Sequence, residues 1–325
     1  MDARVVVLGS ANLDVTLTVD RVPAAGETVL TPTAPARAAG GKGLNQAIAA
    51  ARSGAVPVTF VGAVGDDGDG TYLADRLTAA GVHPMLRVDR TRATGMALVL
   101  LERGGENRIV VASGANLALD DVTPAEAREV GVADVLLMPA ETPVAGLVEA
   151  ARAARSNGTL VVLNAAPVPA RVADLVPFVD VLVVNESEAA AVLAALAHDE
   201  AGAGDDPPGR TGDQPSGLAA ADSVAAALTG WFSAVVVTLG GQGVVWTQHG
   251  EPPRRVAAFD VPVLDTTGAG DTFCGALAAA LATGADTAAA VERGVAASAL
   301  AVQRPGASSA VPTRAEVDAL LASRA

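Results

Sequence analysis

Short apolar runs separated by helical segments constrain the fold of this chain more than any other feature of its sequence. The runs are continuous in β-branched residues or Leu and do not alternate apolar with polar side chains, which is typical of strands buried on both faces of a parallel sheet. The runs occupy residues 5–8, 58–61, 135–138, 160–163, 181–184 and 235–239, and helical patterns occupy residues 44–52, 72–80, 144–156, 186–197 and 218–232. This alternation predicts an α/β fold with a doubly wound, mostly parallel sheet and helices on both faces.

Some strand patterns break the alternation because no helix lies between them. They occupy residues 15–19, 27–30, 96–101 and 107–111. Such pairs are typical of hairpins and predict a small second sheet, built from about 15–38 and 95–112, that covers the active site as a lid. An exposed sheet face favours pairing with another chain, so we expect a homodimer through the lid.

We expect the whole chain, residues 1–325, to form a single domain that includes this lid. The composition changes to Asp, Pro and Gly between residues 198 and 217, which predicts a flexible insertion.

The charge balance excludes several classes of partner. The chain has 36 Asp and Glu against 22 Lys and Arg, a net charge of −14, and contains no block of basic residues. Nucleic acid and anionic membranes are therefore not expected partners. A single cysteine, Cys274, fits a reducing compartment, and no apolar run reaches the roughly 20 residues that span a bilayer. We expect a cytoplasmic protein.

The stretch Asp265-Thr-Thr-Gly-Ala-Gly-Asp271 precedes an apolar run over residues 272–281. The glycines allow a tight turn and the run predicts a buried helix, so backbone amides should gather at the N-terminus of that helix. Unpaired amides and the positive end of the helix dipole form an anion hole that favours a phosphate. Asp271 adds a carboxylate that can accept a proton from an attacking hydroxyl. This combination favours phosphoryl transfer.

A simpler interpretation of the same stretch is structural, since Asp271 could cap its helix while the glycines serve an ordinary turn. Two other nucleotide-binding motifs do not match. A dinucleotide fingerprint that starts at Gly268 needs a third glycine where Phe273 stands, and a P-loop needs Ser or Thr where Gly43 follows Lys42. The rest of the chain has to distinguish a cap from a catalytic base.

Polar side chains follow the first predicted strand and a glycine cluster at residues 40–43. Asn12 and Asp14 are two residues apart, so an extended segment presents both on one face, where they match vicinal sugar hydroxyls. The glycines let the backbone approach a small ligand, and Lys42 and Asn45 add polar contacts. Ordinary turns explain each of these groups as well.

Later strands are followed by Glu141, by Asn185 with Glu188, and by Thr238 with nearby glycines. Asn185 could contact a phosphate and Glu188 could organise hydrated Mg²⁺, which usually keeps several waters. Alternatively, Glu188 only complements a helix dipole. A hydroxyl and flexible backbone at Thr238 suit a nucleotide, although glycine turns also occur without any ligand.

Taken in this order, the motifs resemble those of the ribokinase-like family of sugar kinases, and the resemblance covers nearly the whole chain. The motifs that carry it are Gly40-Gly-Lys-Gly-Leu-Asn45-Gln-Ala, Asp265-Thr-Thr-Gly-Ala-Gly-Asp271, the Asn185-x-x-Glu188 pair, and Asn12 with Asp14. The resemblance implies transfer of the γ-phosphoryl group of ATP to a primary hydroxyl of a sugar. Our leading hypothesis is the 5-hydroxyl of D-ribose, which gives ribose 5-phosphate.

The resemblance also implies a role for each matching residue. Asp271 would be the general base beside an anion hole of Gly268, Ala269 and Gly270. The sugar would be held by Asn12, Asp14, Gly40, Gly41, Lys42, Asn45 and Glu141, and ATP by Asn185, Thr238, Gly240 and Gly243. Glu188 would act on Mg²⁺ through water, and a monovalent cation, usually K⁺, would bind at Asp265, Thr267, Ala301, Arg304 and Gly306.

The chain departs from the family pattern in three places. Ala310 stands where a Ser often precedes the last Val-Pro, so one cation ligand is either only a backbone carbonyl or missing. Val295 stands where a His or Asn often lies near adenine, which could loosen the choice of nucleotide. The insertion at residues 198–217 lengthens a connection on the nucleotide side.

Three other functions compete with the leading hypothesis. Another kinase of the family would act on deoxyribose, a different sugar or a nucleoside, but a nucleoside calls for an aromatic clamp and the chain has only 5 Phe, 2 Trp and 1 Tyr. A sugar sensor without catalysis would be expected to lose Asp271 and the anion hole first, and both are intact. A nicotinamide oxidoreductase is disfavoured by the absent third glycine.

Overall fold

The computed structural model describes the chain except for residues 1–2, 32, 103–106, 201–217 and 325. Most of the predicted insertion at residues 198–217 therefore lies outside the described residues. Its first residues, 198–200, end helix α5 (Glu186–Glu200). Within the described part of the chain, no helix is both long and apolar enough to cross a membrane.

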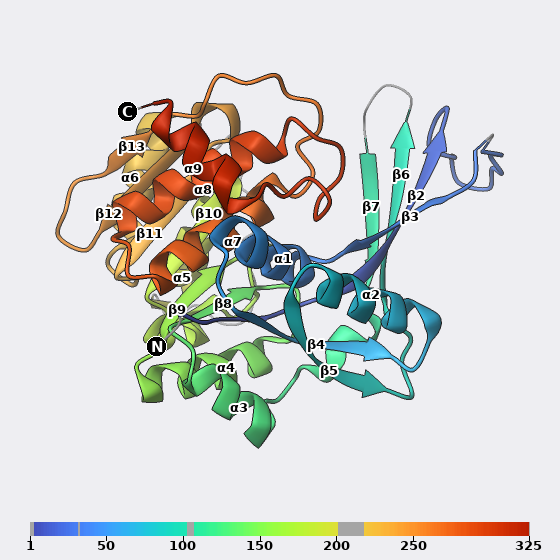
Figure 1. Ribbon diagram of the computed structural model, residues 1–325, viewed down its shortest axis with the longest axis horizontal. Coiled ribbons are helices and arrows are strands. Elements are labelled where there is room, and N and C mark those ends of the chain that lie inside the picture. Colours follow the sequence, from blue (N-terminus) through green and yellow to red (C-terminus); the bar gives the residue numbers. More distant parts are fainter. Residues whose placement is uncertain (1–2, 32, 103–106, 201–217, 325) are drawn as a thin grey trace.

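A nine-stranded sheet forms the centre of the molecule, with the strand order β13-β12-β11-β10-β9-β8-β1-β4-β5 (Figure 1). The strands from β11 to β5 in this order run parallel, whereas β12 and β13 are antiparallel at one edge. Their bounds are β1 (Val5–Leu8), β4 (Val58–Gly65), β5 (Val82–Asp89), β8 (Val135–Pro139), β9 (Leu160–Asn164), β10 (Val181–Asn185), β11 (Ala234–Thr238), β12 (Val244–Gln248) and β13 (Arg254–Val256). The predicted doubly wound sheet is confirmed, and every predicted run overlaps one of these strands.

Helices cover both faces of this sheet because its strands are apolar on both faces. Successive side chains of a strand point to opposite faces, so Val5 and Val7 join one core while Val6 and Leu8 join the other. The first core packs against α1 (Lys42–Gly54), α2 (Gly68–Ala79), α7 (Ala269–Ala282) and α8 (Thr287–Ala301), and the second against α3 (Pro124–Gly131), α4 (Val144–Asn157), α5 and α6 (Leu218–Leu228). Helix α9 (Arg314–Ala322) packs outside α7 and α8. Each fully buried Val or Leu contributes about 1.5–3 kcal/mol to this arrangement.

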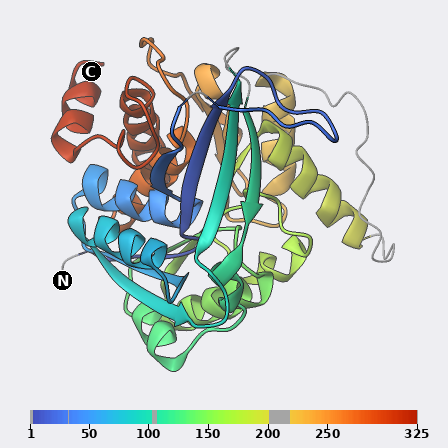
Figure 2. The ribbon, with the colours of Figure 1, turned by 90° about the vertical axis from the view of Figure 1, so that its right-hand side faces the viewer.

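A separate four-stranded sheet projects from one side of the large sheet (Figures 1 and 2). Its order is β3-β2-β6-β7, with bounds β2 (Asn12–Val19), β3 (Ala36–Gly40), β6 (Gly95–Glu102) and β7 (Asn107–Ala112). Strands β2 and β6 are parallel, while the two outer pairings are antiparallel. The small second sheet is therefore confirmed, and β2 leads directly from β1 into it.

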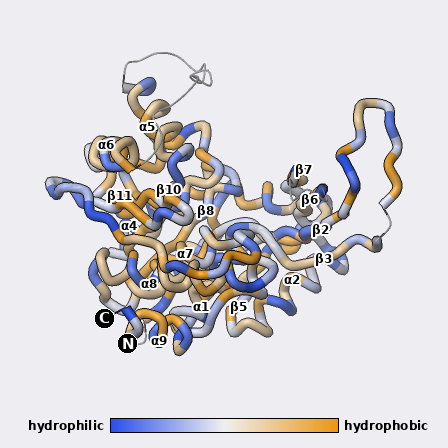
Figure 3. The backbone as a smooth tube through the Cα atoms, turned by 90° about the horizontal axis from the view of Figure 1, so that it is seen from above, coloured by the Kyte–Doolittle hydropathy of each residue, from blue (hydrophilic) through white to orange (hydrophobic). Residues whose placement is uncertain are grey.

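The predicted strand at residues 27–30 is wrong. The partner of β2 is β3, and residues 27–30 belong to the arm between them, which extends away from the body of the molecule (Figure 3). The reason is local: Glu27 pairs with Arg21 and accepts a hydrogen bond from the amide of Ala24 at 3.1 Å. This closes a loop that leaves Leu30 88% exposed and Val29 only partly buried, so the run has no sheet face to pack on.

Candidate active site

Asp271 lies in the first turn of α7 and is buried, with 9% of its surface exposed. Its Oδ1 accepts a hydrogen bond from Gln46 Nε2 at 3.0 Å, and its Oδ2 accepts one from Asn45 Nδ2 at 3.2 Å. Both donors belong to α1. The residue before α7 is Gly268, with φ 70°, and no side chain caps the helix there. The simple capping role is therefore wrong for Asp271, because its carboxylate binds α1 instead of the end of its own helix.

The surroundings of Asp271 act on its pKa in opposite directions. Burial raises the pKa above its ordinary value of 3.8, and the charge of Glu141 adds to this. Lys42 and the amides of Gln46 and Asn45 lower it, because they stabilise the ionised form. The result is a buried carboxylate with a donor on each oxygen and a raised pKa, which suits a group that accepts a proton during a reaction.

Residues predicted to bind a sugar lie beside this carboxylate, on β2 and β3. Asn12 is paired with Gly40 across the two strands, and Asp14 lies further along the same face of β2. A Cβ on Gly40 would lie 2.1 Å from Asp14 Oδ2, so only glycine leaves room for that carboxylate. Burial, followed by the charges of Glu141 and Asp271, raises the pKa of Asp14 to about 6. Asp14 is thus close enough to Glu141 and Asp271 for their negative charges to raise its pKa.

Glu141 joins the end of β8 to the start of α1. Its Oε2 accepts hydrogen bonds from Ser10 Oγ at 2.5 Å and from the Lys42 amide at 2.9 Å. Burial alone would lower the pKa of Lys42, but the charges of Asp271, Glu141 and Glu188 raise it overall. Lys42 therefore stays a cation among carboxylates.

Gly41 brings the start of α1 against the strand that leads into the small sheet. It has φ 87°, and a Cβ there would lie 2.9 Å from the backbone of Ser10 and Asn12.

A cavity of about 260 Å³ connects Asp271 with the ends of β9, β10 and β11. It is lined by Lys42, Asn164, Asn185, Glu188, Thr238, Gly268, Gly270, Asp271 and Cys274, among others. Asn185 and Glu188 bind each other reciprocally: the Asn185 amide donates to Glu188 Oε2 at 2.9 Å, and the Glu188 amide donates to Asn185 Oδ1 at 2.8 Å. Asn185 therefore caps α5, and the Glu188 carboxylate returns a bond to the Asn185 amide in the first turn of that helix. Glu188 also lines the cavity that the α7 N-terminus borders.

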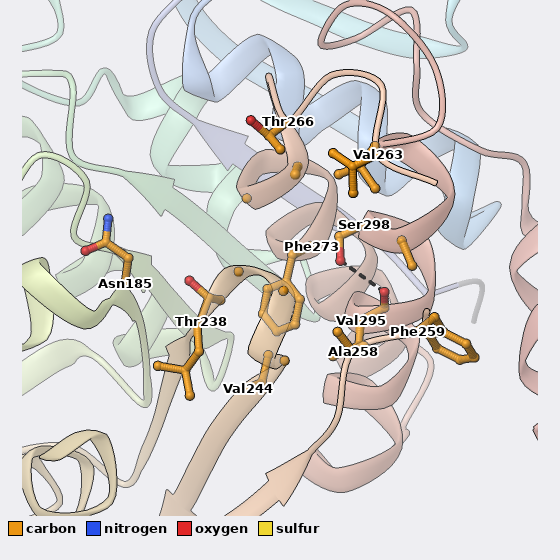
Figure 4. Close-up of a pocket in the computed structure, with 18 of the residues that line it drawn as sticks. Asn185, Thr238, Val244, Ala258, Phe259, Val263, Thr266, Phe273, Val295 and Ser298 are labelled. Carbon is orange, nitrogen blue, oxygen red and sulfur yellow. Dashed lines mark hydrogen bonds between the residues drawn. The ribbon is translucent and has the colours of Figure 1, made fainter. Parts of the chain in front are cut away.

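The larger neighbouring pocket has a volume of about 650 Å³ (Figure 4). All four residues predicted to contact ATP line it, namely Asn185, Thr238, Gly240 and Gly243. Its other wall comes from α7 and α8 and is apolar, with Phe273 in the middle and Val295 beyond it. The Ser298 hydroxyl on that wall donates to the Val295 carbonyl at 3.0 Å and so points back to its own helix.

Three of the five residues predicted to bind a monovalent cation are joined by hydrogen bonds. Asp265 accepts from the amides of Thr267 at 2.9 Å and Gly306 at 2.8 Å. The Arg304 side chain pairs with Glu316, so only its backbone carbonyl is left for a cation. Ala301 is buried and its carbonyl accepts from the Arg304 amide at 3.0 Å. In the described residues, no group of three or more His, Cys, Asp or Glu side chains could hold a metal ion.

Several polar residues of the site were given no role from the sequence. Gln46 and Asn164 are hydrogen-bonded to each other behind Asp271. Asn116 fixes the start of β2, because its side chain accepts from the Ala11 amide at 2.9 Å and donates to Asn12 Oδ1 at 2.8 Å. Gln46 stands inside the glycine motif and Asn116 ends Gly114-Ala-Asn116, another stretch that resembles the family, so both could have been suspected. Asn164 stands in no motif, and its partner Gln46 is 118 residues away in the sequence.

Comparison with known proteins agrees with this geometry. The model of the pfkB family of carbohydrate kinases matches residues 2–314. The chain is 34% identical over 322 residues to the ribokinase of Schizosaccharomyces pombe, which covers 97% of this chain and 96% of that protein. It is 36% identical over 321 residues to the ribokinase of Bacillus subtilis, covering 97% and 98%.

Among solved structures, Arabidopsis thaliana ribokinase complexed with ribose and ATP has a TM-score of 0.83 and 32% identity, covering 99% of each chain. The match to the family model spans nearly the whole chain, and the fold and the curated relatives agree with it. The chain belongs to the pfkB family of carbohydrate kinases.

Proposed function

We propose that this enzyme transfers the γ-phosphoryl group of ATP to the 5-hydroxyl of D-ribose and gives ribose 5-phosphate. The observation that carries the proposal is the position of Asp271, between the sugar-side residues of β2 and α1 and the cavity at the N-terminus of α7. Relatives with this activity cover nearly the full chain, and a structural neighbour was solved with ribose and ATP.

Asp271 acts as the general base in this proposal. The sugar hydroxyl approaches the carboxylate, transfers its proton to it and attacks the γ-phosphorus, while the bond from that phosphorus to the bridging oxygen of ADP breaks. The amides of Gly268, Ala269 and Gly270 and the positive end of α7 stabilise charge on the phosphoryl oxygens. The Ala269 amide is the least available of them, because it already donates to the Thr266 carbonyl at 3.2 Å.

Sugar binding falls to Asn12, Asp14, Gly40, Gly41, Lys42, Asn45 and Glu141. Among the described residues, Asn45 Oδ1 is one of a few buried side-chain atoms without a hydrogen-bond partner. A buried acceptor of this kind is costly unless a ligand satisfies it. A sugar hydroxyl beside Asp271 supplies the missing donor.

ATP occupies the larger pocket, where Asn185, Thr238, Gly240 and Gly243 contact it. Glu188 fits Mg²⁺, because it is an acidic side chain in the phosphate-side cavity and Mg²⁺ needs few protein ligands when it keeps its waters. Such an ion neutralises charge on the phosphate oxygens of ATP.

K⁺ is proposed as an activator at Asp265, Thr267, Ala301, Arg304 and Gly306. The bonds from Asp265 to the Thr267 and Gly306 amides hold these loops together. Ala310 is buried and has no hydroxyl, so it contributes at most a carbonyl.

The small sheet is proposed to act as a lid on the sugar and as a dimer interface within the single domain 1–325. Strands β6 and β7 carry exposed apolar side chains, namely Met96 on β6 and Ile109, Val110 and Val111 on β7. Exposed apolar side chains gathered on one small sheet are typical of interaction sites.

A coupled assay of ADP release tests the proposed function. ATP and Mg²⁺ are supplied with ribose, deoxyribose, fructose or adenosine, each in K⁺ and in Na⁺. We expect ribose to give the highest kcat/KM and K⁺ to raise it. A higher kcat/KM for another acceptor would make that acceptor, and not ribose, the substrate. Binding of ribose without turnover on any acceptor would favour a sugar sensor.

A further inference from the structure

A series of carboxamides lies behind Asp271, and the proposed reaction does not use it directly. Asn164, the last residue of β9, donates from Nδ2 to the Val183 carbonyl of β10 at 3.1 Å. Its Oδ1 accepts from Gln46 Nε2 at 3.0 Å. The same Gln46 nitrogen donates to Asp271 Oδ1 at 3.0 Å. The series therefore runs from a backbone carbonyl in the large sheet to the carboxylate on α7.

The backbone carbonyl fixes the orientation of every group in this series. A carbonyl oxygen only accepts hydrogen bonds, so Asn164 must present Nδ2 to Val183 and Oδ1 to Gln46. Gln46 must then present Nε2, whose two hydrogens serve Asn164 and Asp271. If the Gln46 amide were turned over, its Oε1 would face two acceptor oxygens and both bonds would be lost.

Burial makes these orientations costly to change. Gln46 is 0% exposed and Asn164 is 8% exposed, so water cannot easily replace a lost bond. Gln46 Oε1 has no hydrogen-bond partner among the residues that the structure describes. The Gln46 carboxamide is therefore held only through the hydrogen bonds that its Nε2 donates.

We propose that Gln46 is a positioning residue for Asp271, and that Asn164 acts through Gln46 by fixing the orientation of its amide. The inference rests on the proposed function, because it takes Asp271 as the base. Gln46 occupies one lone-pair direction of Oδ1 and holds the carboxylate in place. The remaining lone pairs stay directed toward the sugar hydroxyl.

Several charged and titratable groups face Asp271 besides these amides. They are Lys42 on α1, Glu141 after β8, Asp14 on β2 and Cys274 on α7. Burial raises the pKa of the Cys274 thiol well above its ordinary value, so the thiol stays neutral. With Lys42 unchanged, removal of the Gln46 donor should make Asp271 easier to protonate and move the acid limb of the kcat profile to higher pH.

A double-mutant cycle tests the proposal with Gln46→Met, Asn164→Leu and the pair, on whichever acceptor the wild-type enzyme phosphorylates fastest. Gln46→Met should lower kcat about 10- to 100-fold, as expected for the loss of one hydrogen bond to a charged group, with little change in KM for ATP. The acid limb of the kcat profile of this variant should move to higher pH. Asn164→Leu should lower kcat less, and should have no further effect in the Gln46→Met background.

Ser53→Ala is the matched control, because Ser53 is buried on the same helix and donates only to the Ala49 carbonyl, at 2.5 Å. It should leave kcat and the acid limb unchanged. Gln46→Glu keeps the shape of the side chain and should move the acid limb of the kcat profile to a higher pH than Gln46→Met does. This second variant allows the test to be made if Gln46→Met does not fold.

Wild-type kcat and an unmoved acid limb in either Gln46 variant would overturn the positioning role. Effects of Gln46→Met and Asn164→Leu that simply add would overturn the role assigned to Asn164. Neither result would contradict the proposed sugar kinase activity, because that activity is measured separately on the wild-type enzyme.

Discussion

Asp14, which we propose to bind the sugar, is expected to lower the stability of the folded protein at neutral pH. Its carboxylate is half-buried near Glu141 and Asp271, and its pKa is raised from 3.8 to about 6. The folded protein therefore binds this proton more tightly than the unfolded chain does. Stability contributed by the protonated form is lost as pH rises from about 4 to 6, and it stays lost above that range.

Asp14→Asn should remove this penalty. At pH 7 we expect the free energy of unfolding to rise by at most about 3 kcal/mol, because one pKa unit corresponds to about 1.4 kcal/mol. The gain should be smaller at pH 5, and KM for ribose should rise at both pH values because a sugar contact is weakened. Urea denaturation at the two pH values measures the first effect. A variant no more stable than the wild type at pH 7 would show that Asp14 carries no such cost.

Single residues differ in how far the sequence could identify them. Asp271 and Asn45 lie in motifs whose chemistry points to a site, and the structure joins them by a hydrogen bond. Asn164 ends an apolar strand with no motif around it, and its partner Gln46 is 118 residues away in the sequence. A lone amide has no periodicity, so only the folded structure reveals such a contact.

At the scale of elements, the site depends on how closely α1 approaches α7. Small residues line their contact: a Cβ on Gly54 would lie 2.1 Å from the Cβ of Ala279, and a Cβ on Gly275 would lie 2.5 Å from the Gln46 carbonyl oxygen. This close approach lets the amides of α1 reach the carboxylate of α7.

Gly275→Ala should push the two helices apart. The added methyl meets backbone that cannot rotate away, so overpacking should cost about 1–3 kcal/mol despite the better helix propensity of alanine. We also expect kcat to fall, since the bonds to Asp271 lengthen. Thermal unfolding and steady-state kinetics measure both effects. Gly68→Ala, where nothing lies within 4 Å, is the control and should be neutral or stabilising. Equal behaviour of the two variants would contradict this account.

The apolar wall of the pocket that we propose for ATP predicts weak selection of the nucleotide base. Phe273 and Val295 offer no hydrogen bond, and the Ser298 hydroxyl is taken by its own helix. Apolar pockets discriminate by only about 10- to 200-fold, so kcat/KM for ATP should exceed that for GTP by no more than this. A ratio near 10⁴, typical of sites that read polar groups, would show that the base is recognised by hydrogen bonds.

The parallel strands at the centre of the large sheet could be predicted because buried parallel strands have a distinctive composition. The other strands went unpredicted: β5 is partly exposed along most of its length, β12 pairs antiparallel with its neighbours, and β13 has only 3 residues. Helices α3, α8 and α9 also went unpredicted. Pairing in the small sheet was assigned to the wrong segment because the contacts of Glu27 with Arg21 and Ala24 favour a loop there.

At the scale of the whole molecule, the small sheet is the surface that we propose for the homodimer. Val110 on β7 is 68% exposed. In the proposed homodimer, Val110→Lys should place a charge in the interface and shift the enzyme toward monomer, which sedimentation velocity measures. Val88→Lys on β5 is the control, because Val88 is 57% exposed but belongs to the large sheet. If Val110→Lys left dimerisation unchanged, the dimer interface could not include this part of the small sheet.

The most direct test of the central claim is the turnover of Asp271→Asn, measured together with calorimetric binding of ribose and ATP to the same variant. The account predicts that both ligands still bind and that kcat falls by about 10²- to 10⁴-fold, the usual cost of losing a general base. A kcat close to that of the wild-type enzyme would contradict the assignment of Asp271 as the base.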